Sequence, residues 1–206
     1  NFAVREARGE YLLFLNNDVE IITESWLEEM LQLCQQKDVG MAGAKLYYPD
    51  DTIQHAGVVV GLGGVAAHVL CKLPRDAEGY MGRLRCVQEI SAVTAACMMV
   101  KTSVFKAVGG FDEELKVAFN DIDLCMKVRK YGVKIVFTPY AELYHYESKS
   151  RGMEDTPEKQ LRFSREVNCF RRKWERELLK GDPYYNPNLT LNNTDCSLRK
   201  QEKNGD

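Results

Sequence analysis

The feature that most constrains the fold of this chain is a short apolar run that stops abruptly at polar residues. Tyr11–Leu15 is apolar throughout, and Asn16, Asn17 and Asp18 follow it directly. A run of this length bounded by turn residues is typical of a buried strand in a parallel sheet. Ligands of open α/β sheets bind beyond the carboxyl ends of the strands, so an acid there is well placed to hold a divalent cation and, through it, a phosphate. The alternative is that the three polar residues only form the turn that ends the strand.

Strand-like and helix-like patterns alternate along the rest of the chain and predict an α/β fold. Between the predicted elements, residues 71–86 form a polar segment that we expect to include a loop over the substrate site. Gly132 closes one predicted helix, and Pro139 is expected to end the strand that follows it. Helices are predicted over 1–8, from 23 or 24 to 34, from 102 to 108 and from 120 to 131, and strands over 39–46, 53–60, 87–100 and 133–137.

Composition narrows the class of protein. The chain has 206 residues and a formal net charge of −2, whereas nucleic-acid-binding domains are usually distinctly basic. No apolar run approaches the roughly 20 residues of a membrane-spanning helix, and no secretory signal is visible. The seven cysteines are scattered without a C-x-x-C pair, which argues against a thiolate metal site or a disulfide framework. We therefore expect a cytoplasmic domain that binds no nucleic acid.

Several motifs together resemble the family 2 glycosyltransferases. The segment from Asn1 through Gly9-Glu10-Tyr11 into the Asn16–Asp18 turn is similar to the part of that family that ends in its D-x-D motif. The strings GGFDE, at 109–113, and NDIDL, at 120–124, extend the resemblance to about Gly152. It implies a partial GT-A fold, a Rossmann-like mixed sheet flanked by helices. Asn16 stands where the family has its first acid, and Asp18 matches the last, which carries the metal.

The resemblance also implies roles for individual residues. Asp18 and His145 are expected to hold Mn²⁺ or Mg²⁺, since carboxylate oxygen and neutral imidazole suit such ions. Asp121 is the expected catalytic base. The alternatives are that His145 is a structural histidine between two tyrosines, and that Asn120 and Asp121 only cap a helix. Further candidates for donor or acceptor binding are Asn16, Asn17, Gly109, Gly110, Phe111, Asp112, Asn120, Asp123, Lys149 and Arg151, with Asp123 either structural or acceptor-orienting.

The function that these residues predict is inverting transfer of a sugar from a nucleotide-diphosphate sugar to a hydroxyl of a saccharide or lipid-linked saccharide. The similarity is greatest to enzymes of bacterial cell-surface polysaccharide and O-antigen assembly, including rhamnosyltransferases. In that family about half of the nucleotide-binding sheet precedes this segment. We therefore expect residues 1–152 to be the C-terminal part of a GT-A domain, inactive by itself. The alternatives are a non-catalytic module and a nucleotidyltransferase.

The C-terminal quarter has a different pattern. Residues 153–181 are predicted to contain an amphipathic helix whose stripe runs through Phe163, Val167, Phe170, Trp174 and Leu178. Either this stripe packs on the domain, or the basic helix over 157–180 rests on anionic lipid at the inner face of the membrane. Residues 182–206 are rich in Asn, Pro and Lys, and we expect them to be disordered.

Overall fold

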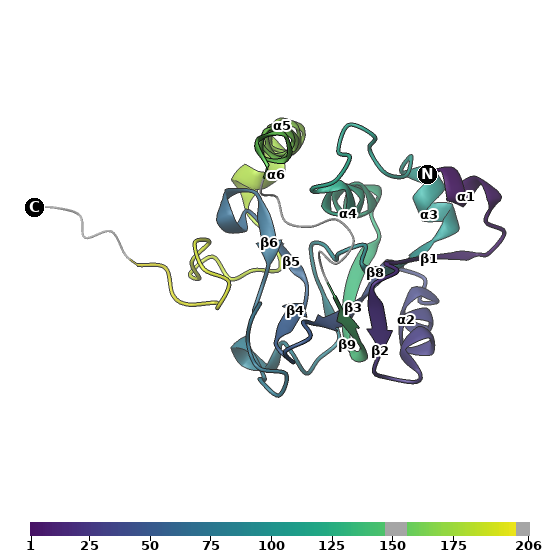
Figure 1. Ribbon diagram of the computed structural model, residues 1–206, viewed down its shortest axis with the longest axis horizontal. Helices are drawn as coiled ribbons and strands as arrows, with labels where there is room; N and C mark the ends of the chain where they lie inside the picture. Colours follow the sequence, from purple (N-terminus) through teal and green to yellow (C-terminus); the bar gives the residue numbers. More distant parts are fainter. Residues whose placement is uncertain (147–155, 201–206) are drawn as a thin grey trace, which may run out of the picture.

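The computed structural model describes residues 1–146 and 156–200, and a mixed sheet of seven strands forms its centre (Figure 1). The strand order is β1-β8-β3-β9-β2, with β4 added at β3 and β7 at β9. A separate hairpin joins β5 to β6. The predicted α/β class is therefore confirmed. The strands are β1 (Tyr11–Leu15), β2 (Val19–Ile21), β3 (Val39–Tyr47), β4 (Ile53–His55), β5 (Val58–Val60), β6 (Ala66–His68), β7 (Gln88–Glu89), β8 (Cys97–Lys101) and β9 (Lys134–His145).

Helices cover both faces of the sheet. Met30 and Leu33 of α2 pack with Leu46 and Leu143 on one face, while Leu124 of α4 belongs to the core on the other face. Figure 1 shows α2 and α4 on opposite sides of the strands. The alternation of a strand produces this division, because successive side chains point to opposite faces. The helices are α1 (Phe2–Glu6), α2 (Trp26–Cys34), α3 (Thr102–Ala107), α4 (Asn120–Tyr131), α5 (Pro157–Lys173) and α6 (Glu175–Lys180), with short 3₁₀ turns at Leu62–Gly64 and Tyr80–Gly82.

The direction of β1 differs from the prediction. Within the described residues β1 pairs with β8 alone, antiparallel, from Tyr11 opposite Lys101 to Leu15 opposite Cys97. The parallel pair of this sheet is β3 with β9. Leu15 is 42% exposed, so the strand is not fully buried either. An apolar run predicts a strand, but it carries no information on the direction of the neighbouring strand.

The strand β9 is longer than predicted, and its extension builds the site described below. It continues through Pro139 to His145. The register with β3 shifts there, so that Gly43 faces Phe137 whereas Lys45 faces Glu142. A bulge of this kind tolerates a proline that a regular ladder would exclude.

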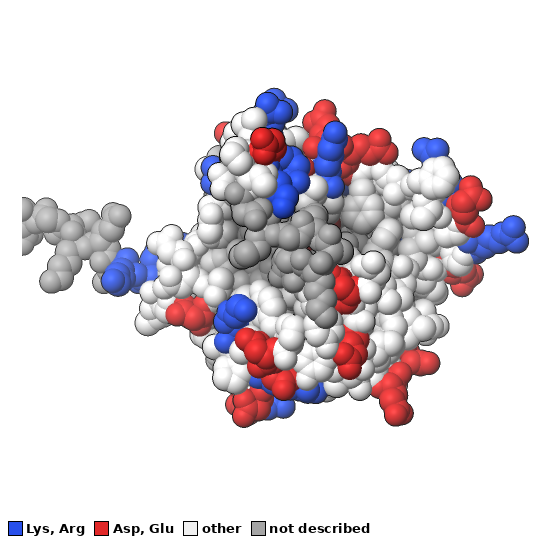
Figure 2. Space-filling model, in the orientation of Figure 1, with Lys and Arg blue, Asp and Glu red and all other residues white. Residues whose placement is uncertain are grey.

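The predicted C-terminal helix is interrupted at Trp174, which separates α5 from α6. Phe170 and Trp174 are buried in the core, and Val167 and Leu178 pack partly against it. Lys and Arg side chains gather on the outer surface of this region (Figure 2). The apolar stripe thus packs on the domain, and the buried rings of Phe170 and Trp174 are not available to lipid. None of the helices in the described part combines the length and the apolar character that crossing a bilayer requires.

Residues 182–200 are packed, which corrects the prediction of a disordered tail for this part of it. The carboxylate of Asp182 accepts a hydrogen bond from Val60 N at 2.7 Å, and Leu70 N donates to Thr194 O at 2.6 Å. Tyr185 and Leu189 are buried. The polar composition suggested disorder, but a few apolar side chains and backbone hydrogen bonds to the β5–β6 hairpin suffice to anchor the segment.

The closest glycine contact in the sheet generates a test of the fold. Val93 lies directly over Gly43 of β3, where an added Cβ would be 2.3 Å from Val93 Cγ1. We expect Gly43→Ala to lower the free energy of unfolding by about 1–3 kcal/mol, because overpacking a rigid core displaces its neighbours. Chemical denaturation measures this. In a double variant with Val93→Ala the clash is relieved, so the loss should be smaller than the sum of the two single losses. Additive losses would contradict the assigned contact.

Candidate active site

The Asn16–Asp18 turn meets the end of β9. Val19 of β2 lies opposite His145 of β9, and Tyr146 N donates to Asp18 O at 2.8 Å. This pairing places Asp18 Oδ1 3.3 Å from His145 Nε2. The two residues that the sequence suggested as metal ligands therefore lie side by side, although they are far apart in the chain.

Gln54 of β4 fixes the tautomer of His145. Its Oε1 lies 2.7 Å from His145 Nδ1, and its Nε2 donates to His145 O at 3.2 Å. Since an amide oxygen only accepts, Nδ1 carries the proton and Nε2 carries the lone pair. That lone pair accepts from Asn16 Nδ2 at 3.0 Å. A second residue that holds Nδ1–H in this way is the usual support of a metal-binding imidazole.

The Asp18–His145 pair fits a divalent cation of the Mg²⁺ or Mn²⁺ type. Asp18 Oδ1 is buried and has no hydrogen-bond partner in the described part of the chain. Adjacent ligands of an octahedral ion with bonds of about 2.1 Å are about 3 Å apart, close to the spacing of this pair. The described residues contain no group of three or more His, Cys, Asp and Glu that suits a metal. Asn16 supplies an amide in place of a second acid, so most positions around such an ion fall to phosphate oxygens and water.

Asp121 lies at the first turn of α4. The helix starts after Phe119, which has a left-handed backbone (φ 63°), so Asn120 is the first helical residue and not the cap that we considered. Asp121 Oδ1 accepts from Ile122 N at 2.9 Å, and Oδ2 accepts from Ala95 N at 3.1 Å. The carboxylate is half-buried, and two backbone N–H groups orient it. Each oxygen has a further lone pair, with which it can take a proton.

Three consecutive residues before β8 connect the parts of this site. Thr94 N donates to His55 Nε2 at 3.5 Å, Ala95 N donates to Asp121, and Ala96 O accepts from Asn16 N at 3.0 Å. Burial lowers the pKa of His55 well below its ordinary value, so this histidine is neutral. This segment leaves no side-chain signal in the sequence, because backbone groups carry the contacts.

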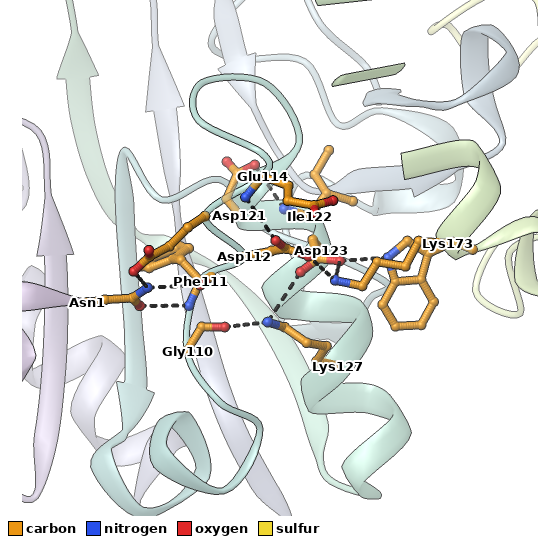
Figure 3. A network of polar contacts seen from close by, with 12 residues as sticks. Asn1, Gly110, Phe111, Asp112, Glu114, Asp121, Ile122, Asp123, Lys127 and Lys173 are labelled. Atoms are coloured by element: carbon orange, nitrogen blue, oxygen red, sulfur yellow. Dashed lines mark hydrogen bonds and ion pairs between the residues drawn. The ribbon is translucent and has the colours of Figure 1, made fainter. Parts of the chain in front are cut away.

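Asp123 anchors α4 to α5. It is fully buried, and Lys173 Nζ and Trp174 Nε1 each lie 2.8 Å from its Oδ1 (Figure 3). Lys127 Nζ lies 3.3 Å from Oδ2, and Lys173 also contacts Asp112. Cations and an indole surround it and no atom is exposed, which is the environment of a structural acid. The same lysine joins Asp112 to this network.

The glycine turn before α4 is held from the start of the chain. Gly109 and Gly110 both have positive φ, which only glycine adopts readily. Asn1 Oδ1 accepts from Phe111 N and Asn1 Nδ2 donates to Phe111 O, both at 2.9 Å (Figure 3). The ring of Phe111 packs edge-on against Phe14 with centroids 4.9 Å apart. These contacts make Phe111 an anchor of the turn.

The remaining expectations differ in outcome. Asn17 is exposed in the turn, where it has the solvent access that a binding residue needs. Lys149 and Arg151 lie outside the described residues. The 71–86 segment does border cavities: Arg75 and Arg85 line one of about 820 Å³, and Cys71 lines one of about 270 Å³. The larger cavity contains none of Asp18, Asp121 and His145.

The Lys173 network generates a pH-dependent prediction. The hydrogen bond from Lys173 holds the pKa of Asp112 below its usual 3.8. Because the folded-state pKa is the lower one, this stabilisation is complete above about pH 4 and is lost as the pH falls through the lowered value. Lys173→Met should therefore lower the free energy of unfolding by about 1–3 kcal/mol at pH 7, and by less in acid.

Denaturation at several pH values checks this prediction. Lys180→Met, in the exposed last turn of α6, is the matched control and should change stability by less than about 0.5 kcal/mol. A loss for Lys173→Met that stays the same from neutral pH to pH 3 would be the contrary result.

Known proteins with similar sequences place this chain among its relatives. An uncharacterized protein, y4gI, of Sinorhizobium fredii is 56% identical over 96% of this chain, and the O-antigen biosynthesis protein RfbC of Myxococcus xanthus is 41% identical over 100% of it. A 62-residue stretch is 36% identical to an N-acetylglucosaminyl-diphospho-decaprenol L-rhamnosyltransferase of Mycobacterium tuberculosis. The chain spans only 22% and 16% of the first two relatives.

Two solved glycosyltransferases share the fold. A mannosyltransferase of Pyrobaculum calidifontis, in complex with GDP-Man and Mn²⁺, aligns with 85% of this chain and 42% of its own at a TM-score of 0.53 and 15% identity. A GalNAc-transferase with UDP, GalNAc and Mn²⁺ aligns with 86% of this chain and 34% of its own at a TM-score of 0.60 and 13% identity. The predicted GT-A fold is thereby confirmed.

The family model described as "Glycosyltransferase like family" matches residues 1–166. Together with the relatives, this match means that the chain belongs to the glycosyltransferase-like family 2.

Proposed function

We propose that this chain carries the metal pair and the catalytic base of an inverting glycosyltransferase, which transfers a sugar from a nucleotide-diphosphate sugar to a hydroxyl. The observation that carries the proposal is the convergence of two sites on one backbone segment. Asp18 meets His145 at 3.3 Å, and the turn before Asp18 is bonded to Ala96, one residue from the Ala95 N–H that holds Asp121. Two adjacent residues, Ala95 and Ala96, thus bond to the carboxylate of Asp121 and to the turn that carries Asp18.

Each group has a distinct part in the reaction. Asp18 Oδ1 and His145 Nε2 would hold Mn²⁺ or Mg²⁺, which neutralises charge on the leaving diphosphate. Asp121 accepts the proton of the acceptor hydroxyl as that oxygen attacks the anomeric carbon. The two N–H groups on Asp121 keep its carboxylate oriented while it does so. A direct displacement that uses one base and forms no covalent intermediate inverts the anomeric configuration.

The relatives support the class of substrates. One has a name that refers to O-antigen biosynthesis and another is a rhamnosyltransferase that acts on a diphospho-decaprenol. The structural neighbours were solved with GDP-Man or UDP and with Mn²⁺. We infer a saccharide or lipid-linked saccharide acceptor in cell-surface polysaccharide assembly. All seven cysteines are free thiols, which supports a reducing, cytoplasmic setting.

The base is tested by Asp121→Asn, assayed in a protein that contains this chain at its natural length. The substitution keeps the size and a hydrogen-bond acceptor for Ile122 N, but it removes the proton acceptor. We expect kcat to fall by about 10²–10⁴, the usual contribution of a general base. Donor binding, followed by titration calorimetry, should barely change. Asp123→Asn is the comparison, and its loss of activity should follow its loss of thermal stability. Near-normal turnover by Asp121→Asn would return this residue to a role in orienting α4.

The metal pair is tested by binding, without reference to turnover. An ion that binds only the folded protein raises its melting temperature. We expect Mn²⁺ to raise the melting temperature of the wild type, and to do so much less for Asp18→Ala and His145→Ala. Asp76→Ala, which removes an exposed acid elsewhere, is the matched control. An equal Mn²⁺ response in all four proteins would rule out the pair as the metal site.

A further inference from the structure

A second, smaller cavity shares walls with the proposed active site. It has a volume of about 270 Å³, and its lining includes Gln54, His68, Cys71, Thr94 and His145. His145 is one member of the metal pair, and Thr94 precedes the Ala95 N–H that holds Asp121. A ligand in this cavity would therefore touch a residue of the metal pair on one side and the segment that positions the base on the other.

The described residues that line the cavity are uncharged, with polar groups set among apolar surface. They include hydroxyls, an amide and imidazoles, and no Asp, Glu, Lys or Arg is among them. The larger cavity of about 820 Å³ is different, because Lys45, Arg75, Arg85 and Glu142 line it. From these residues a charged ligand would gain no opposite charge in place of the water that it loses, which costs much free energy. A ligand with neutral hydroxyls also loses water, but hydrogen bonds to the lining can replace it.

Hydrogen bonds fix the tautomers of His55 and His68. Thr94 N donates to His55 Nε2, so the neutral ring of His55 carries its proton on Nδ1. That N–H faces His68 Nδ1 at 3.0 Å, and His68 therefore carries its own proton on Nε2. The two rings are in edge-to-face contact with centroids 4.9 Å apart. The pair thus gives the cavity a neutral imidazole with a fixed tautomer, which is suited to recognising hydroxyl groups.

We propose that the cavity between Gln54, His68, Thr94 and His145 is a subsite for one neutral sugar ring. Its volume of about 270 Å³ lies just below the range of about 300–1,000 Å³ for cavities that hold drug-sized ligands, so it admits a single ring rather than an oligosaccharide. Uronic acids and other anionic sugars are excluded by the uncharged lining. The ring belongs either to the donor or to the end of the acceptor, and this assignment rests on the proposed function.

Saturation-transfer NMR on this chain tests the subsite, with methyl glycosides of glucose, galactose, mannose and rhamnose as probes and methyl glucuronoside as the charged control. Chelator is present and no nucleotide is added, so the measurement is independent of the metal. We expect a signal from at least one neutral glycoside and none from the glucuronoside. Cys71→Leu, which fills the cavity, should abolish the signal. Cys86→Leu is the matched control, because Cys86 is exposed and does not line the cavity.

The outcomes separate the subsite from the proposed function. No signal from any neutral glycoside, an equal signal from the glucuronoside, or a signal that survives in a folded Cys71→Leu would overturn the subsite. Melting curves of Cys71→Leu and Cys86→Leu establish that both variants fold, so that a lost signal reports on the cavity. Because the signal is read with chelator and without turnover, a failure of the roles proposed for Asp18 and Asp121 would not by itself change it. In the protein of natural length with Mn²⁺, displacement of the glycoside by a nucleotide sugar but not by the bare nucleoside diphosphate identifies the donor ring. Retention of the glycoside identifies the acceptor ring.

Discussion

The pairing of β2 with β9 is the contact on which the rest of the site depends. It sets Val19 opposite His145, and so brings the acid at the end of one polar turn to an imidazole from a distant part of the chain. Side chains alternate along a strand, so a slip of one residue would turn His145 to the other face of the sheet. The bulge after Phe137 is part of this register, because it carries β9 past Pro139 with its last residues still paired to β3. Gln54 then fixes which nitrogen of His145 carries the lone pair.

A second constraint is the path of residues 93–96. Val93 is seated over a glycine, and the next three residues bond in turn to His55, Asp121 and Asn16. Because a side chain at Gly43 would displace Val93, the packing of the sheet directly sets the position of these backbone groups. A rigid core therefore determines the spacing between the proposed base and the polar turn. Backbone groups that are fixed by a packed core hold a reacting geometry well, because they have little freedom.

The sequence was informative where chemistry resides in side chains, and less so where it resides in the backbone. The strand at Tyr11–Leu15, the helix at Asn120–Tyr131 and the fold class were predictable from periodicity and motifs. The direction of β1, the passage of β9 through Pro139 and the packing of residues 182–200 were not. Each depends on partners that are distant in the chain, which a local pattern does not encode. The link through Ala95 and Ala96 could not be predicted either, because alanine offers no polar side chain.

Asp121 and Asp123 lie in the same turn of α4 but have different surroundings and different proposed roles. Residues two apart on a helix do not face each other, so the two carboxylates enter different surroundings. Asp123 is buried among Lys127, Lys173 and Trp174, and its charge is neutralised by cations that no substrate can displace. Among the described residues, Asp121 accepts hydrogen bonds from backbone N–H groups and stays half-buried. The network around Asp123 thus ties α4 to α5, and the carboxylate of Asp121, the proposed base, lies outside it.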